Sequence, residues 1–234
     1  MAQTKANKHP HAMNILHEDN HIIIINKRAG EIVQGDKTGD ASLCDTLKQY
    51  LKEKYNKPGN VFVGLPHRLD RPVSGIVIFA KTSKALERLN EMFREGRVDK
   101  RYWAITRELP EEPEKELTHW IVRNEKMNKS FAYPKEVKNS KKATLRYKVK
   151  ASSRTYNLIE VELLTGRHHQ IRCQLSAIGC PIKGDLKYGA KRSNPDGSIS
   201  LHARSVEFIH PVSKENIKIT APIPQDTLWQ SFEE

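Results

Sequence analysis

The hydrophobic positions of this chain fall mostly into short runs that favour strands. Two continuous apolar runs are long enough for buried strands and too short for buried helices. Two later segments alternate apolar and polar positions, which predicts a pair of strands, each with one buried face, joined as a hairpin. Strands are expected at 21–26, 75–80, 101–107, 145–149, 157–164 and 201–208.

Helical spacing of apolar residues appears in three places. Ser42, with Asp45 three positions on, predicts the start of one helix, and further helices are expected at 83–95 and 170–178. Residues 110–142 are rich in Pro, Glu, Lys and Asn and are expected to form loops and short strands over the surface. Strands and helices do not alternate regularly, so the pattern predicts an α+β fold with a mixed, largely antiparallel sheet and flanking helices.

Domain organisation and targeting follow from composition. Residues 1–12 are polar and basic and are expected to be a disordered tail, whereas 13–234 contain no linker-like stretch and are expected to form a single domain. No apolar run reaches the roughly 20 residues of a membrane span, and the first residues lack the apolar core of a signal peptide. The three cysteines show no C-x-x-C spacing and are expected to be reduced thiols. A cytoplasmic protein is therefore predicted.

The charge balance is strongly basic. Forty Lys and Arg against 28 Asp and Glu give a formal net charge of +12 and a pI near 9.6. Such a surface raises the local concentration of polyanions, of which nucleic acid is the most abundant in cells. Charge alone leaves open a solvated basic surface without a specific partner.

One acid stands out within residues 64–82, where Asp70 lies between Arg68 and Arg71 and just before the apolar run at 75–80. Nearby prolines stiffen a turn and Gly75 permits close backbone approach, so Asp70 is expected on a tight turn that leads into a buried strand. This placement suits a catalytic carboxylate. An exposed acid paired with its arginine neighbours is the alternative at this point.

Four clusters are candidates for one site: NKRAG at 26–30, HRLDRPVSG at 67–75, KRYWAIT at 100–106 and TGRHHQIRCQL at 165–175. Together with GCPIKGD at 179–185 and the pair Tyr188-Gly189, these clusters resemble the RluA-type family of RNA pseudouridine synthases. The motifs come in the family's order, and the resemblance covers roughly residues 14 to 225.

The resemblance implies a pseudouridine synthase-like catalytic fold with a cleft across the sheet, and isomerisation of uridine in rRNA or tRNA without cofactor or metal. Asp70 matches the family's catalytic acid, Arg172 its cationic partner, and Tyr102 the tyrosine that stacks on the uracil and is a candidate to help remove the C5 proton. The target base must be flipped out of its stack, and Arg71 is expected to fill the vacated space. The residues expected to bind RNA are Lys27, Arg68, Arg71, Lys100, Arg167, His169 and Gln170.

Two positions depart from the family pattern: Arg28 replaces a proline and Val73 replaces a threonine. An S4-like RNA-binding domain is not expected, because little chain precedes the first motif. We expect a monomer with no obligatory protein partner.

Three alternatives are open. A nucleotide-binding loop at 30–38 has its spacing broken by Asp36. A glycosidase would need a second carboxylate across the bond. The third alternative is an RNA-binding protein without catalysis. Adjacent His168 and His169 are poor partners for one zinc ion, because neighbouring side chains point apart.

Overall fold

The computed structural model describes residues 13–35 and 39–232, so the predicted tail at 1–12 lies outside the described residues. Within these ranges, ten strands form one sheet. The strands are β1 (Ile15–Glu18), β2 (Ile22–Lys27), β3 (Ser74–Ala80), β4 (Val98–Thr106), β5 (Glu114–Asn124), β6 (Lys129–Tyr133), β7 (Lys141–Ser152), β8 (Asn157–Leu163), β9 (Leu201–Ile209) and β10 (Asn216–Thr220).

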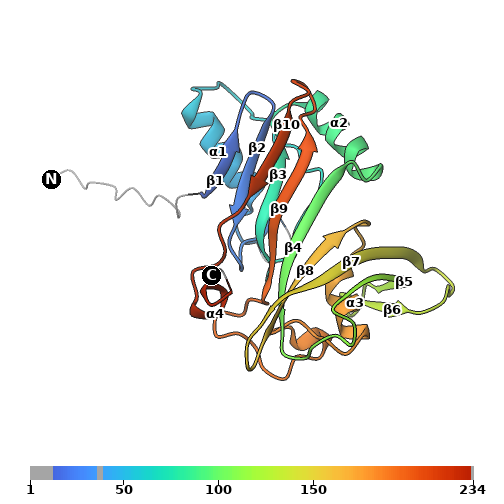
Figure 1. Cartoon of the computed structure of the whole chain (residues 1–234). Coiled ribbons are helices and arrows are strands. Elements are labelled where there is room, and N and C mark those ends of the chain that lie inside the picture. Colours follow the sequence, from blue (N-terminus) through green and yellow to red (C-terminus); the bar gives the residue numbers. More distant parts are fainter. Residues whose placement is uncertain (1–12, 36–38, 233–234) are drawn as a thin grey trace.

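The strand order is β1-β2-β3-β9-β4-β8-β7-β5-β6, with β10 paired to β9. Every pairing is antiparallel except that of β3 with β9. Figure 1 shows β9 and β4 running through the middle of the molecule, with the first three strands above and β5 to β8 below. The mixed, largely antiparallel α+β sheet expected from the sequence is therefore confirmed.

The contact between β3 and β9 requires a glycine. Gly75 has a φ of +111°, and a Cβ atom built there would lie 2.4 Å from the backbone oxygen of Ala203. The two strands pair only through Ser74 with His202 and through Gly75 with Ala203. The close approach that the sequence predicted at Gly75 is confirmed, and it brings the turn before β3 against the start of β9.

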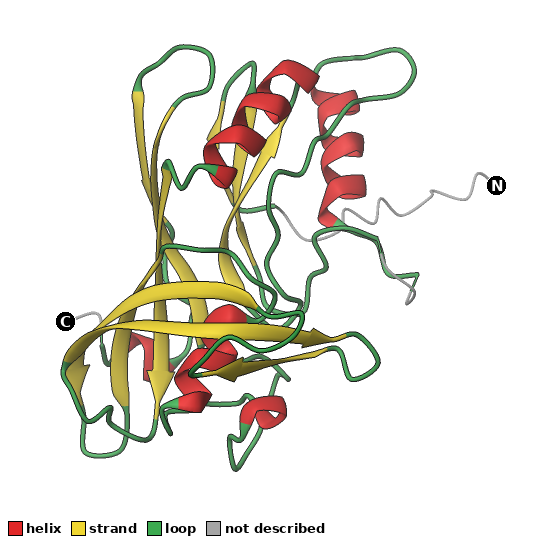
Figure 2. Cartoon of the chain, turned by 90° about the vertical axis from the view of Figure 1, so that its right-hand side faces the viewer, coloured by secondary structure: helices red, strands yellow, loops and turns green. Residues whose placement is uncertain are grey.

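Four α-helices complete the described part of the chain: α1 (Leu43–Lys54), α2 (Ser83–Arg94), α3 (Gln170–Ala177) and α4 (Thr227–Gln230). Ser42 caps α1 as predicted, since its hydroxyl accepts from the backbone N–H of Asp45. Figure 2 shows α1 and α2 beside the upper part of the sheet and α3 under the long curved strands of the lower part. No helix among these residues is long and apolar enough to cross a membrane.

The core joins β2 and β3, whose residues are almost all buried. All four isoleucines at 22–25 are at most 1% exposed, which explains why this run forms a strand inside the sheet. Apolar side chains of α1 and α2, including Leu47 and Leu89, pack on the same cluster. This rigid half of the molecule carries the turn that holds Asp70.

The expectation of loops and short strands over 110–142 is wrong for β5, which runs for eleven residues. Only Leu117 and Ile121 of that strand are buried, and its other side chains, near the edge of the sheet, are exposed or partly buried. Such a sparse apolar pattern carries little strand signal, even though β5 pairs along β7 over eight residue positions. The strand expected to be the last one, β9, is also followed by β10.

Candidate active site

A cleft of about 580 Å³ opens where the turn before β3, the end of α2, the start of β4 and the segment between β8 and α3 meet. Its lining contains all three predicted catalytic residues and five of the predicted RNA-binding ones. These eight are Arg68, Asp70, Lys100, Tyr102, Arg167, His169, Gln170 and Arg172. Segments that are distant in sequence therefore bring most of the predicted site into one cavity.

Asp70 lies on a tight turn, in which its carbonyl accepts from the N–H of Val73 at 3.1 Å. Its side chain is 31% exposed, and its Oδ2 accepts a hydrogen bond of 2.9 Å from Nη1 of Arg172. Arg172 comes from α3, and its own side chain is only 6% exposed. The carboxylate thus reaches the cleft while a buried cation holds one of its oxygens.

Arg172 is itself fixed by a second acid, Asp185, which the sequence did not single out. Nε and Nη2 of Arg172 donate to the two oxygens of Asp185 at 2.7 and 2.9 Å, in a two-pronged fork. Asp185 is 1% exposed, and the ring of Tyr188 lies under the guanidinium at 5.0 Å. Burial disfavours the charge, but Asp185 and then Asp70 hold the pKa of Arg172 above its ordinary value. The one available signal was its place in the matched GCPIKGD motif.

Tyr102 forms part of the cleft from β4 and is 8% exposed. Burial, reinforced by the negative charge of Asp70, raises the pKa of its phenol well above the ordinary value. The hydroxyl therefore stays protonated at neutral pH. A flat, protonated ring beside the carboxylate suits stacking on a base better than proton abstraction.

Two of the predicted RNA-binding residues are buried supports. Lys27 is 1% exposed, and its ammonium donates to the carbonyls of Arg28 and Arg71, with burial lowering its pKa to about 8. Gln170 is 3% exposed, and its side-chain oxygen accepts from the N–H of Arg167 at 2.9 Å. Both side chains hold the loops beside Asp70, and a direct contact of either with RNA stays a prediction.

The two departures from the family pattern have simple structural settings. Arg28 is exposed, and its N–H donates to the Glu31 carboxylate at 2.8 Å, which closes the turn without a proline. Val73 is 2% exposed and packs in the main apolar cluster, where its methyl groups need no hydrogen-bond partner. Neither position disrupts the contact between Asp70 and Arg172.

The remaining cations differ in accessibility. Arg68 and Arg167 are exposed at the cleft, and Lys100 is half-buried there with a pKa lowered by burial. Arg71 is exposed but outside the cleft lining, and it pairs with Asp40 at 2.7 Å. Three cations at the mouth of one cleft can engage phosphate groups.

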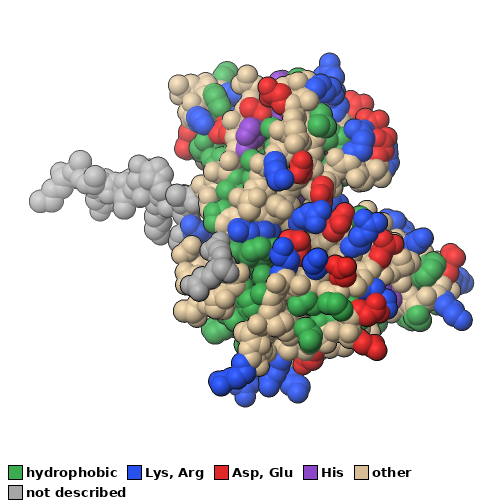
Figure 3. Space-filling view, in the orientation of Figure 1, with side chains coloured by type: hydrophobic (Ala, Val, Ile, Leu, Met, Phe, Trp, Pro, Cys, Tyr) green, Lys and Arg blue, Asp and Glu red, His purple; other side chains and the backbone are tan. Residues whose placement is uncertain are grey.

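A second charged region has mixed sign. Figure 3 shows Lys, Arg, Asp and Glu side chains interspersed over the middle of the molecule. Arg101, adjacent to Tyr102 on β4, lies within 3.8 Å of Glu160 and Glu162, and Arg146 pairs with Glu116 at 2.9 Å. Successive strand residues point to opposite faces, so this ladder faces away from the cleft. Its alternating charges make it a poor surface for a polyanion.

Comparison with known proteins agrees with the fold and the motifs. The family model described as RNA pseudouridylate synthase matches residues 21–177. The chain belongs to this family of RNA-modifying enzymes, and the resemblance stated from the sequence is confirmed.

Individual relatives support the assignment. The ribosomal large subunit pseudouridine synthase C of Buchnera aphidicola subsp. Baizongia pistaciae is 32% identical over 217 residues, which cover 89% of this chain and 66% of that protein. The uncharacterized RNA pseudouridine synthase YlyB of Bacillus subtilis is 30% identical over 220 residues, covering 93% and 71%. The chain thus spans about two thirds of the length of these curated relatives.

A solved structure shows the same fold. The human RNA pseudouridylate synthase domain containing 4 matches with a TM-score of 0.77 and 26% identity, over 91% of this chain and 89% of that one. Human RNA pseudouridylate synthase domain containing 1 matches with a TM-score of 0.72 at 22% identity. The expected pseudouridine synthase-like fold is therefore confirmed.

Proposed function

We propose that this chain converts uridine in structured RNA to pseudouridine, with Asp70 as the catalytic carboxylate. The observation that carries this proposal is the ion pair of 2.9 Å between Asp70 and the buried Arg172, within a cleft that also contains Tyr102. The buried guanidinium of Arg172 places a positive charge directly against this partly exposed carboxylate. The family assignment supplies the reaction, and this cluster supplies a suitable nucleophile.

The reaction is an isomerisation. A carboxylate oxygen of Asp70 attacks or stabilises C1′ of the sugar as the bond between C1′ and N1 breaks. The detached uracil rotates, C5 bonds to C1′, and the carboxylate is released. C5 then loses its proton and N1 gains one, so atoms and electrons balance without an oxidant or reductant. Tyr102 supports the rotating ring by stacking, and its raised phenol pKa makes the hydroxyl a poor base for the C5 proton.

The substrate must enter the cleft as an extruded nucleotide, because the reacting atoms of a stacked base are inaccessible. Arg71 follows Asp70 directly and is our candidate to occupy the vacated space. Its present partner is Asp40, and both side chains are about half exposed, so releasing this pair costs at most about 1 kcal/mol. Arg68 and Arg167 are placed to hold the flanking phosphates.

Ribosomal RNA is the first substrate to test, because the Buchnera relative is named for the large ribosomal subunit. Transfer RNA is the second. The cleft residues are suited to bind a nucleotide and its phosphates, which ribosomal RNA and transfer RNA have in common. Both kinds of RNA therefore belong in one experiment.

The test measures tritium release from RNA labelled at uridine C5, using ribosomal and transfer RNA prepared from cells that lack this protein. Wild type is compared with Asp70→Asn and with the matched exposed variant Asp40→Asn. We expect release with wild type and Asp40→Asn, and a loss of at least about a thousandfold in Asp70→Asn. Undiminished release in Asp70→Asn would disprove the assigned role.

RNA affinity separates catalysis from binding. Asp70→Asn is expected to bind RNA as tightly as wild type, because the acid makes no favourable phosphate contact. Affinity should fall steeply with added salt, since several cations release counterions on binding. Salt-sensitive binding by wild type, with no release from either RNA pool, would instead favour the non-catalytic RNA-binding protein.

A further inference from the structure

A second set of polar contacts reaches Asp70 through His169 and Tyr188. Nε2 of His169 lies 3.4 Å from Oδ2 of Asp70, and Nδ1 of His169 lies 2.8 Å from the hydroxyl of Tyr188. That hydroxyl also accepts a hydrogen bond of 2.8 Å from the backbone N–H of Ser130 on β6. His169, Tyr188 and Ser130 are all buried, so water does not compete for these contacts.

The direction of each hydrogen bond follows from donor and acceptor chemistry. The backbone N–H of Ser130 can only donate, so the Tyr188 oxygen accepts there. Among the described residues, Nδ1 of His169 is the acceptor within reach of the Tyr188 hydroxyl, which therefore directs its own proton to that nitrogen. Nδ1 of His169 must then be the unprotonated acceptor. A neutral imidazole with a bare Nδ1 carries its proton on Nε2, which is the atom facing the Asp70 carboxylate.

The charge state of the two rings agrees with this direction. Burial lowers the pKa of His169 to about 3, although Asp70 on one side opposes the shift, and Arg172, His168 and Lys187 on the others add to it. Burial likewise raises the pKa of the Tyr188 phenol. Near neutral pH both groups are uncharged, and the contacts have a single consistent direction.

The Asp70 carboxylate is therefore held asymmetrically. Oδ2 accepts a hydrogen bond of 2.9 Å from Nη1 of Arg172, and Nε2 of His169 faces the same oxygen at 3.4 Å, a longer approach that lies outside hydrogen-bond geometry. Oδ1 has no hydrogen-bond partner among the described residues. His169 itself adopts a φ of +53°, an uncommon conformation for a residue with a side chain, which its buried contacts must stabilise.

We infer that Tyr188 and His169 are positioning residues that fix the proton of His169 on Nε2, hold Oδ2 of Asp70, and leave Oδ1 as the oxygen that meets the sugar. This inference rests on the proposed function for its kinetic consequence. Its structural content, the protonated nitrogen of one histidine, does not depend on activity.

The first test is therefore spectroscopic. Long-range ¹H–¹⁵N correlation on protein with ¹⁵N-labelled histidine, assigned with the His169→Gln variant, reports which ring nitrogen carries the proton. We expect the Nε2–H form for wild type near neutral pH and a mixture of forms in Tyr188→Phe. An Nδ1–H form in wild type, or an unchanged spectrum in Tyr188→Phe, would overturn the inference even if the protein proved to be inactive.

The second test compares single and double variants in the tritium assay. Glutamine is the matched replacement at 169, because its amide can donate towards Asp70 without choosing between two ring nitrogens. Tyr188→Phe should lower kcat about tenfold with little change in KM, because the N–H of His169 that faces the charged carboxylate loses its fixed direction. His169→Ala should lower kcat more than His169→Gln does.

The decisive comparison is Tyr188→Phe in the His169→Gln background. There the substitution should change kcat less than about twofold, because no histidine remains to be oriented. An equal tenfold loss in both backgrounds would mean that Tyr188 acts only by supporting the fold, and would overturn the positioning role. Wild type without tritium release would instead count against the proposed function and leave the spectroscopic result to judge this inference.

Discussion

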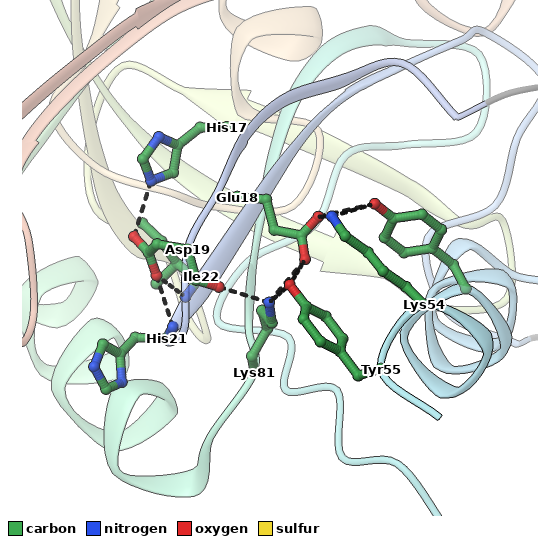
Figure 4. A network of polar contacts seen from close by, with 9 residues as sticks. His17, Glu18, Asp19, His21, Ile22, Lys54, Tyr55 and Lys81 are labelled. Atoms are coloured by element: carbon green, nitrogen blue, oxygen red, sulfur yellow. Dashed lines mark hydrogen bonds and ion pairs between the residues drawn. The ribbon is translucent and has the colours of Figure 1, made fainter. Parts of the chain in front are cut away.

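Two buried clusters of acids and cations lie in different halves of the molecule, and they differ in how completely the acid is satisfied. Figure 4 shows the first, in which Glu18 at the end of β1 is surrounded by Lys54, Lys81 and Tyr55. Its Oε1 accepts from Lys81 at 2.8 Å and Tyr55 at 2.7 Å, and its Oε2 accepts from Lys54 at 2.8 Å and Tyr50 at 2.9 Å. Its side chain is 9% exposed.

The cluster around Asp70 uses similar side chains but leaves the acid incomplete. Arg172 and His169 contact only Oδ2, and 31% of the Asp70 side chain remains exposed in the cleft. The fully paired acid of that cluster is Asp185, which supports Arg172 from behind. From this difference we expect the saturated carboxylate to contribute stability and the restrained carboxylate with one open oxygen to be available for chemistry.

The largest effect that would sharpen this contrast is expected from Asp185→Asn. The substitution leaves the buried Arg172 with Asp70 as its one anionic partner, so the Asp70 carboxylate is expected to shift towards it and out of position. We expect kcat to fall about 100-fold and stability to fall by about 3 kcal/mol. Tritium release and urea unfolding measure the two effects. Asp40→Asn, an exposed acid paired with Arg71, is the control. A variant with normal kcat would show that the fork does not position Asp70.

Glu18→Gln should separate stability from catalysis in the opposite sense. The substitution removes the charge that two lysines share, one of them nearly buried, and should destabilise the fold by about 2 to 3 kcal/mol. Because this cluster is not part of the cleft, kcat on folded protein should not change. Glu207→Gln, an exposed acid paired with Lys218, should leave the free energy of unfolding nearly unchanged. A loss of kcat in Glu18→Gln would break the proposed division.

Acid titration gives a further check on the same residue. The hydrogen bonds from Lys54, Lys81, Tyr55 and Tyr50 outweigh the opposing effect of burial and lower the pKa of Glu18 from 4.5 to about 2. Its contribution to stability is therefore complete above pH 4.5 and is lost as pH falls towards 2. Urea unfolding between these values should show a steeper decline for wild type than for Glu18→Gln. Parallel curves would contradict the assignment.

The smallest effect is expected from Val73→Thr, which restores the residue usual in the family. Val73 is 2% exposed and packs against apolar neighbours, so a hydroxyl there should cost about 1 kcal/mol of stability. We expect kcat to change less than about threefold, since Val73 contributes only its backbone N–H to the Asp70 turn. A gain of tenfold or more would show that the missing hydroxyl matters to the reaction.

Local pattern predicted much of the fold because several elements depend on their own residues. The isoleucine run of β2, the apolar run of β3 and the alternation of β8 each specify a strand, and Ser42 specifies the start of a helix. β5 was not predicted, because a strand near a sheet edge needs few buried positions and its pairing with β7 provides most of its stability. The one parallel pairing, at Gly75, also depends on tertiary contact.

The order of the motifs indicated which residues form the site, but it did not indicate how deeply each side chain is buried. Lys27 and Arg68 have the same charge in sequence, yet one is buried and the other exposed. Burial is decided by neighbouring loops that are distant in sequence. The same limit applies to Asp185 and Tyr188, whose roles depend on contacts with Arg172 and His169 that no local pattern specifies.

The position of β9 also has a consequence for the order in which the protein acquires its structure. β9 lies between β3, which follows the Asp70 turn, and β4, which carries Tyr102. Until residues 201–209 have been synthesised and inserted, these two strands have no common neighbour. Closing such distant contacts is slow relative to forming the hairpins on either side. We therefore expect that, during translation, a growing chain that already contains Asp70, Tyr102 and Arg172 still lacks an assembled cleft.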